Sequence, residues 1–186
     1  GEIGQRGDPV IAVHEDSGTF YYAEIATLGG NPAIGVAVST DDCMSFGAPI
    51  DASPVSSGLA ATSLNDKPWI AVDNTGGAND GNVYVCWTRF ATGGSELRFS
   101  RSTDGGATYI DEQILAPAGT GPFGCSVVVV PAGPPSVIRL RFTVRPVHGD
   151  RSTRKLRHRR SLGLCLGLMY RTKTKRPFSG EAASAT

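Results

Sequence analysis

Two aspartates, Asp8 and Asp66, have the sequence positions that best fit a functional site. Asp8 directly precedes Pro9, Asp66 lies two residues before Pro68, and each stands at the start of a predicted strand. A carboxylate there can belong to a binding site, or it can cap a turn by accepting hydrogen bonds from nearby backbone N–H groups. We favour the capping role for both residues and keep them as candidate binding residues.

The cysteines and histidines do not indicate a metal or redox site. The four cysteines are Cys43, Cys86, Cys125 and Cys165, and the three histidines are His14, His148 and His158. No two cysteines have the C-x-x-C spacing of zinc or redox motifs, and the histidines are scattered. Cys86 lies in an apolar strand, which favours a buried free thiol over a ligand. We expect no metal and no cofactor.

Charge is distributed very unevenly along the 186 residues, although the formal net charge is only +1. Residues 1–130 hold 5 basic and 15 acidic residues, a balance of −10, whereas residues 131–186 hold 13 basic and 2 acidic residues, a balance of +11. One folded domain seldom reverses its charge in this way. We therefore predict that residues 132–186 form a separate basic tail, irregular or disordered, and hypothesise that it is an out-of-frame extension of a truncated gene.

The tail offers little support for a nucleic acid or a membrane as partner. Residues 151–160 contain six Arg or Lys and could contact phosphates, but they lack the interleaved aromatic residues of a stacking platform. The apolar run at residues 162–170 is too short to span a bilayer, and residues 1–6 lack the pattern of a signal peptide. Nucleic-acid binding by the tail is thus kept as a third, disfavoured function.

Short apolar runs separated by turn residues predict an all-β fold for residues 7–131, without helices. The first strands are expected at residues 9–15, 19–27, 33–40 and 46–51. A second copy of this pattern follows, in which Pro9 and Pro68 are 59 positions apart and Asp41 and Asp104 are 63 apart. Four strands in each repeat of about sixty residues is the arrangement of a propeller blade.

A turn motif closes the third strand of each repeat. The second copy contains Ser102, Asp104, Gly106, Thr108 and Tyr109. The first copy contains Ser39, Asp41, Ser45 and Phe46, with Cys43 at the position of the glycine. We expect the carboxylate to accept hydrogen bonds within its own turn and the aromatic residue to pack beneath it. Because Cys43 has a Cβ, the first turn is expected to be strained or differently shaped.

The motif S-x-D-x-G-x-T-aromatic resembles the Asp-box, or BNR repeat, of the sialidase superfamily, and the resemblance covers residues 7–131. It implies a fragment of a β-propeller with two four-stranded antiparallel blades at residues 7–52 and 63–116 and the first strand of a third at 121–131. The Asp-box residues are then structural. A propeller fragment would leave blade faces uncovered, so self-association is expected, with Trp69, Trp87, Phe20 and Tyr84 partly exposed.

The resemblance leaves two functions open. The first is a module, or part of one, that binds glycans or proteins and has no activity of its own. The alternative is a fragment of an exo-sialidase, which would need an arginine trio and a nucleophilic tyrosine. No motif assigns the trio to Arg6, Arg89, Arg98 or Arg101. We expect no turnover by this chain and an extracellular or cell-surface location for its parent protein.

Overall fold

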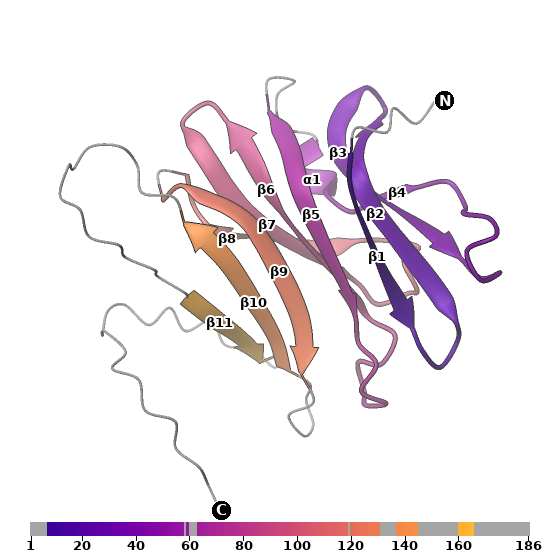
Figure 1. Ribbon diagram of the computed structural model, residues 1–186. Coiled ribbons are helices and arrows are strands. Elements are labelled where there is room, and N and C mark those ends of the chain that lie inside the picture. The colour runs from indigo at the N-terminus through magenta and orange to yellow at the C-terminus, as the bar shows by residue number, and fades with distance from the viewer. Residues whose placement is uncertain are drawn as a thin grey trace, which may run out of the picture.

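The computed structural model describes residues 7–57, 59, 63–118, 120–130, 137–144 and 160–165, whose strands form three antiparallel sheets (Figure 1). The first sheet contains, in order, β1 (Gly7–His14), β2 (Thr19–Leu28), β3 (Asn31–Ser39) and β4 (Ile50–Asp51). The second contains β5 (Leu64–Val72), β6 (Val83–Ala91), β7 (Gly94–Ser102) and β8 (Ile110–Ala116). The third contains β9 (Pro122–Val130), β10 (Val137–Val144) and β11 (Arg160–Cys165). The predicted all-β fold with two four-stranded antiparallel sheets is confirmed.

Tight turns join neighbouring strands and fix their register. The pairing of β2 with β3 runs to Leu28 opposite Asn31, so only Gly29 and Gly30 remain in the turn. Their φ angles are +56° and +82°. A two-residue hairpin requires positive φ, which glycine adopts without a steric penalty.

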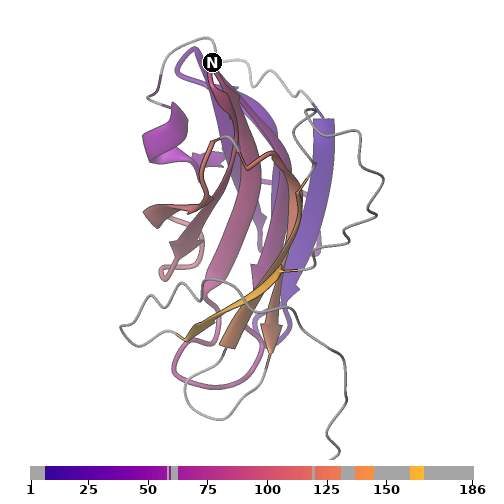
Figure 2. The same cartoon turned by 90° about the vertical axis from the view of Figure 1, so that its left-hand side faces the viewer.

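The sheets lie face to face, and Figure 2 views this stack from the side of the third sheet. Their facing side chains form two apolar clusters. The cluster between the first and second sheets includes Tyr21, Ala23, Ile34, Val36, Ile70, Val72, Val83, Val85 and Trp87. The cluster between the second and third sheets is built by Tyr84, Cys86, Phe99 and Val127. The central sheet is therefore covered on both faces, which explains why β6 is buried from Val83 to Arg89.

A disulfide joins Cys86 of β6 to Cys125 of β9. The prediction of a free thiol at Cys86 was therefore wrong, although its burial was foreseen, since Cys86 is fully buried. The two residues are 39 positions apart, and they meet only because β9 packs across the face of the second sheet. Cys43 is free and exposed.

Four further details differ from the sequence prediction. A short helix, α1 (Pro54–Ser57), follows β4, and β4 itself has only two residues. Trp87 and Tyr84 are fully buried because β9 covers one face of the second sheet and the first sheet covers the other. Trp69 is 44% exposed, as expected.

The segment predicted to be irregular contains β10 and β11, which extend the sheet begun by β9, while the rest of residues 132–186 lies outside the described residues. Within the described part, no helix is long and apolar enough to cross a membrane.

Candidate functional site

The first strands of the three sheets, β1, β5 and β9, all begin with a β-bulge. The register shifts between Gly7 and Val10 in β1, between Asp66 and Trp69 in β5, and between Phe123 and Cys125 in β9. An extra residue at positive φ sits in each bulge: Asp8 at +52°, Lys67 at +52° and Gly124 at +71°. Such bulges re-aim side chains at the end of a sheet. Asp8 thus has Lys67 as its counterpart in the second repeat, and Asp66 corresponds to Gly7.

The three bulges bring together Asp8, Asp66, Lys67 and Phe123, which we call the strand-start cluster. The Lys67 Nζ lies 3.4 Å from the Asp8 Oδ2 and 5.3 Å from the centre of the Phe123 ring. The backbone N–H of Lys67 donates to the Asp66 Oδ1 at 2.8 Å. The Lys67 stem runs beside Gly124, where an added Cβ would lie 4.0 Å from Cδ. Both predicted aspartates therefore belong to one cluster, built from all three sheets.

The charged side chains of the strand-start cluster differ in how exposed they are and in how readily they ionise. Burial raises the pKa of Asp66, and the negative charge of Asp8 adds to this effect, whereas the N–H and the charge of Lys67 oppose it. The Asp8 and Lys67 side chains are 45% and 39% exposed. The cluster therefore offers an exposed acceptor and an exposed cation beside an aromatic ring and a carboxyl that retains its proton to higher pH than an ordinary aspartate. These are groups that bind a polar ligand with one apolar face.

Lys67 and Phe123 are the members of the cluster that sequence reasoning missed. The alignment of Pro9 with Pro68 also aligns Asp8 with Lys67, so Lys67 could have been predicted from the repeat. Phe123 had no such signal, because its ring joins Lys67 only through the packing of β9 against β5. It also contacts Phe90 of β6, with ring centres 6.0 Å apart, which holds it at the surface of the second sheet.

The turns at Asp41 and Asp104 have the same hydrogen-bond network. Asp41 accepts from the Ser45 N–H at 2.9 Å and from its hydroxyl at 2.6 Å, and the Ser39 hydroxyl donates to it at 2.7 Å. These bonds hold the pKa of Asp41 at about 2. The register puts these turns at the opposite end of each sheet from the bulges, since Ser39 pairs with Phe20 while Gly7 pairs with Ile25. They hold hairpins and lie away from the strand-start cluster.

In the second copy, Asp104 accepts from the Thr108 N–H at 2.9 Å and from its hydroxyl, and Ser102 donates to Asp104 at 2.7 Å. The same bonds lower the pKa of Asp104. Tyr109 is buried against the first sheet, whereas its counterpart Phe46 is 38% exposed and touches the ring of Tyr22. The aromatic position of the motif is therefore buried in the copy that faces a neighbouring sheet and partly exposed in the other.

Cys43 does not change the shape of the first turn. Its N–H donates to the Ser39 hydroxyl at 3.1 Å, as the Gly106 N–H donates to that of Ser102 at 2.8 Å. The φ of Cys43 is +64°, close to the +86° of Gly106. A residue with a Cβ is strained at such an angle by about 1 kcal/mol. Of the two alternatives expected for this turn, strain or a different shape, the positive φ of Cys43 fits strain.

Arg89, Arg98 and Arg101 form ion pairs within the second sheet. Arg98 lies 2.8 Å from Glu96 and 2.9 Å from Glu112, Arg89 lies 3.4 Å from Glu96, and Arg101 pairs with Asp111. Glu112 also accepts the N–H groups of Val55 and Ser56 in α1. These contacts give the three arginines structural partners rather than a shared ligand. Arg6 lies outside the described residues.

A second contact between sheets is made by His14 at the end of β1. Its Nε2 lies 3.0 Å from the Asp80 Oδ2, and its Nδ1 lies 2.8 Å from the Ser17 hydroxyl. Asp80 also accepts the Gly76 N–H at 2.8 Å, and these two contacts lower its pKa. No sequence signal linked His14 to Asp80, which is 66 positions away. The contact joins the β1–β2 turn to the β5–β6 loop and stabilises the packing of the two sheets.

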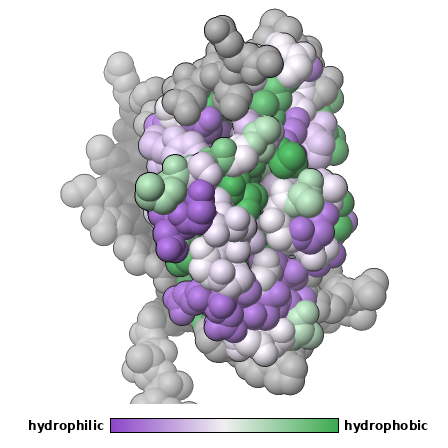
Figure 3. All heavy atoms as spheres, turned by 90° about the vertical axis from the view of Figure 1, so that its right-hand side faces the viewer, coloured by the Kyte–Doolittle hydropathy of each residue, from purple (hydrophilic) through white to green (hydrophobic). Residues whose placement is uncertain are grey.

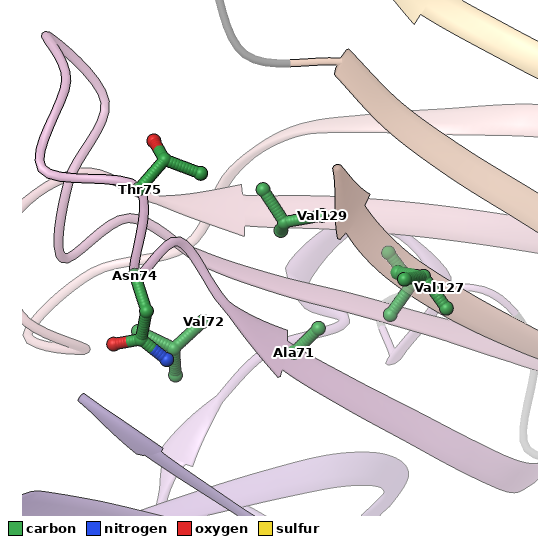
Figure 4. A pocket seen from close by; sticks show the side chains of 7 residues that line it. Ala71, Val72, Asn74, Thr75, Val127 and Val129 are labelled. Carbon is green, nitrogen blue, oxygen red and sulfur yellow. The ribbon is translucent and has the colours of Figure 1, made fainter. Parts of the chain in front are cut away.

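An open hollow of about 300 Å³ lies between the end of β5 and β9 (Figure 4). It is lined by Ala71, Val72, Asn74, Thr75, Val127, Val128 and Val129. No titratable side chain lines it, so it offers shape but no acid, base or charge. Among the described residues, no group of three or more His, Cys, Asp or Glu is placed to hold a metal ion. The strand-start cluster is therefore the better candidate for a functional site.

No protein-family model matches the chain, and no curated protein matches it. The function must therefore be argued from the three bulges and the side chains that they bring together.

Proposed function

We propose that this chain is part of a sialidase-like Asp-box β-propeller and that it binds a glycan or a protein through the strand-start cluster, without catalysis. The recurrence of one bulge at the start of β1, β5 and β9 carries the proposal, because it makes three sheets present their side chains at one place. The identical turn networks at Asp41 and Asp104 support the Asp-box relationship. Fold alone fixes no reaction, and the cluster provides contacts rather than a nucleophile.

The Cys86–Cys125 disulfide supports an extracellular or cell-surface location for the parent protein. Disulfides persist in oxidising compartments and are rare in reducing ones. This bond joins two sheets of the fold. A disulfide that links two sheets of one fold fits a protein that works outside the cytoplasm.

The proposal is tested by titrating the isotopically labelled protein with a methyl sialoside and with a methyl galactoside, followed by NMR. Binding should shift the amide signals of Asp8, Lys67 and Phe123. Phe123→Ala should weaken the affinity about 3- to 10-fold, because it removes the ring on which a sugar face can pack. Phe46→Ala is the matched control, since it removes a partly exposed ring at the far end of the first sheet.

Two results would contradict the proposal. If neither sugar nor any member of a glycan array shifts the cluster signals, and no extracellular protein partner does so, the cluster is not a binding site. Release of fluorophore from a fluorogenic sialoside by the purified chain would instead favour the exo-sialidase alternative. We expect no release.

A further inference from the structure

The β1–β2 turn and the β5–β6 loop bring together a serine, a histidine and an aspartate. The Ser17 Oγ lies 2.8 Å from the His14 Nδ1, and the His14 Nε2 lies 3.0 Å from the Asp80 Oδ2. Ser17 is exposed, whereas the His14 and Asp80 side chains are only 16% and 23% exposed. Figure 3 views the molecule from the side of the first sheet and shows hydrophilic side chains gathered toward its lower end, where the β1–β2 turn lies in Figure 1. The hydroxyl is thus open to solvent while the two groups behind it are largely covered.

Asp80 determines which imidazole nitrogen carries the hydrogen. The Gly76 N–H donates to the Asp80 Oδ1 at 2.8 Å, and this bond, together with the contact to His14, lowers the pKa of Asp80. An ionised carboxylate can only accept hydrogen bonds, so the His14 Nε2 must donate to it. In a neutral imidazole, Nδ1 then has a free lone pair. That lone pair faces the Ser17 hydroxyl and can accept its proton.

Contacts with the β5–β6 loop hold the imidazole in place. The Asn74 side chain accepts from the Glu15 N–H at 2.9 Å. It also donates to the Val13 carbonyl at 3.0 Å, so the residues on both sides of His14 are held. The His14 ring lies against Gly81, where an added Cβ would be 3.6 Å from Cε1. A base that is already held at hydrogen-bond distance from its nucleophile needs no rearrangement before it takes the proton.

The Ser17 Oγ has a second neighbour that favours negative charge on it. The Thr19 N–H donates to this oxygen at 3.3 Å, and the Thr19 hydroxyl lies 2.8 Å away. When the Ser17 proton points toward His14, the Thr19 hydroxyl can rotate to donate to the same oxygen. Both groups then stabilise the charge that develops as the proton leaves.

We propose that Ser17 is a nucleophile that accepts an acyl group from a small activated ester, with His14 as its general base and Asp80 as the residue that positions His14. The Ser17 Oγ attacks the carbonyl carbon of the ester while the His14 Nδ1 takes the hydroxyl proton. The bond from that carbon to the leaving oxygen then breaks, the leaving group departs with the proton, and acyl-Ser17 remains.

The position of Ser17 limits the substrate and separates this site from the strand-start cluster. Ser17 is not one of the residues that line the hollow between β5 and β9, so the substrate is expected to be small. His14 pairs with Thr19 at one end of β1, whereas Gly7 pairs with Ile25 at the other end, beside the strand-start cluster. Either proposal can therefore fail while the other holds.

Acetylation by p-nitrophenyl acetate tests the proposal, with the reaction stopped in acid and the acetylated residues identified by peptide mapping. Ser45 is the internal control, because it is also exposed and its hydroxyl donates to a carboxylate, that of Asp41, at 2.6 Å, in a contact without a histidine. A general base contributes about 10²–10⁴-fold, so Ser17 should be acetylated at least about 100-fold faster than Ser45.

Release of p-nitrophenol is followed in parallel, so that an acetyl group that is later lost by hydrolysis is still detected. Equal acetylation of Ser17 and Ser45 would overturn the proposal. It would also be overturned if no acetyl-Ser17 formed and Ser17→Ala released p-nitrophenol as fast as the unmodified chain. Neither comparison depends on a change to His14 or Asp80, which join two sheets.

Substitutions separate the roles of the two supporting residues. His14→Gln should slow acetylation of Ser17 at least about 100-fold, because it removes the base. Asp80→Asn should slow it at least about 10-fold, because an amide N–H can donate to Nε2 and leave the hydrogen on Nδ1. Asp80→Glu keeps a carboxylate and should retain part of the rate. Glu15→Gln is the matched control, because it removes an exposed carboxylate beside His14 but keeps the N–H that donates to Asn74, and it should not change the rate.

NMR of the nitrogen-labelled imidazole distinguishes positioning by Asp80 from a purely structural role. In the neutral form, the unmodified chain should carry the hydrogen of His14 on Nε2, and Asp80→Asn should carry it on Nδ1. Hydrogen on Nδ1 in the unmodified chain would overturn the assigned roles. Acetylation of Asp80→Asn at the unmodified rate would also overturn them.

Discussion

Breaking the Cys86–Cys125 disulfide should lower the free energy of unfolding by about 4 kcal/mol. The bond spans 39 positions of sequence. In the chain-entropy model, a loop of that length removes ~13 cal/mol/K from the unfolded chain, which is about 4 kcal/mol at 25 °C. Domains of this size are stable by roughly 5–15 kcal/mol in total. Reduction should therefore remove a large part of the stability and loosen β9 from the second sheet.

The assay is urea unfolding followed by the fluorescence of Trp69 and Trp87, with and without reductant. With a slope near 2 kcal/mol/M, the midpoint should fall by about 2 M. A double variant with Ser at Cys86 and Cys125 should reproduce the reduced protein, and Cys43→Ser should match the oxidised one. The reasoning is refuted if reductant leaves the midpoint in place, or if peptide mapping under non-reducing conditions finds Cys86 and Cys125 unlinked.

Three further predictions concern the repeat, the ion pairs and pH. Gly106→Ala should destabilise the chain by about 1–3 kcal/mol more than Gly105→Ala, because both are strained by positive φ but only the first meets atoms at 3.1 Å; equal urea midpoints for the two variants would contradict this. Glu112→Gln should cost about 3 kcal/mol, since it uncouples a buried ion pair, whereas Asp111→Asn at an exposed pair should change stability by less than about 1 kcal/mol. Comparable losses in chemical denaturation would argue against that distinction. The lowered pKa of Asp104 means that its contribution is full above its unfolded pKa of about 3.9 and is lost as pH falls through the folded value. Asp104→Asn should flatten the decline in thermal stability below about pH 4, and an unchanged slope would show that the carboxylate is not responsible.

The first two sheets could be predicted from sequence because each depends on local signals. Gly29-Gly30 allows only a tight turn, and the β-rich runs on either side set the register once that turn is fixed. Pro9 and Pro68 mark the same bulged strand start, where a missing N–H does not break the ladder. The match between two such repeats then predicts two equal sheets without any knowledge of how they pack.

The strand-start cluster and the disulfide could be predicted only in part, because both depend on packing between sheets. Asp8 and Asp66 were singled out one by one, but their proximity requires β1 and β5 to lie side by side with their bulges level. Cys86 and Cys125 carry no spacing signal, since they face each other across two sheets rather than along one strand. In β10, basic residues alternate with apolar ones, which is a strand pattern. The strand was missed because the charge of this segment differs so sharply from that of the rest of the chain.

Cys43 and Gly106 show that the glycine position of the repeated turn serves two physical purposes. One is conformational, because the turn needs positive φ at this position, and Cys43 meets that need at +64° with some strain. The other is steric, because an added Cβ at Gly106 would come within 3.1 Å of Tyr21 and Val38. Cys43 is exposed and meets no such neighbour in the described structure. The first requirement belongs to the turn and the second to the interface between sheets. A cysteine in the first copy is therefore compatible with the hairpin, because the first copy has to meet only the conformational requirement.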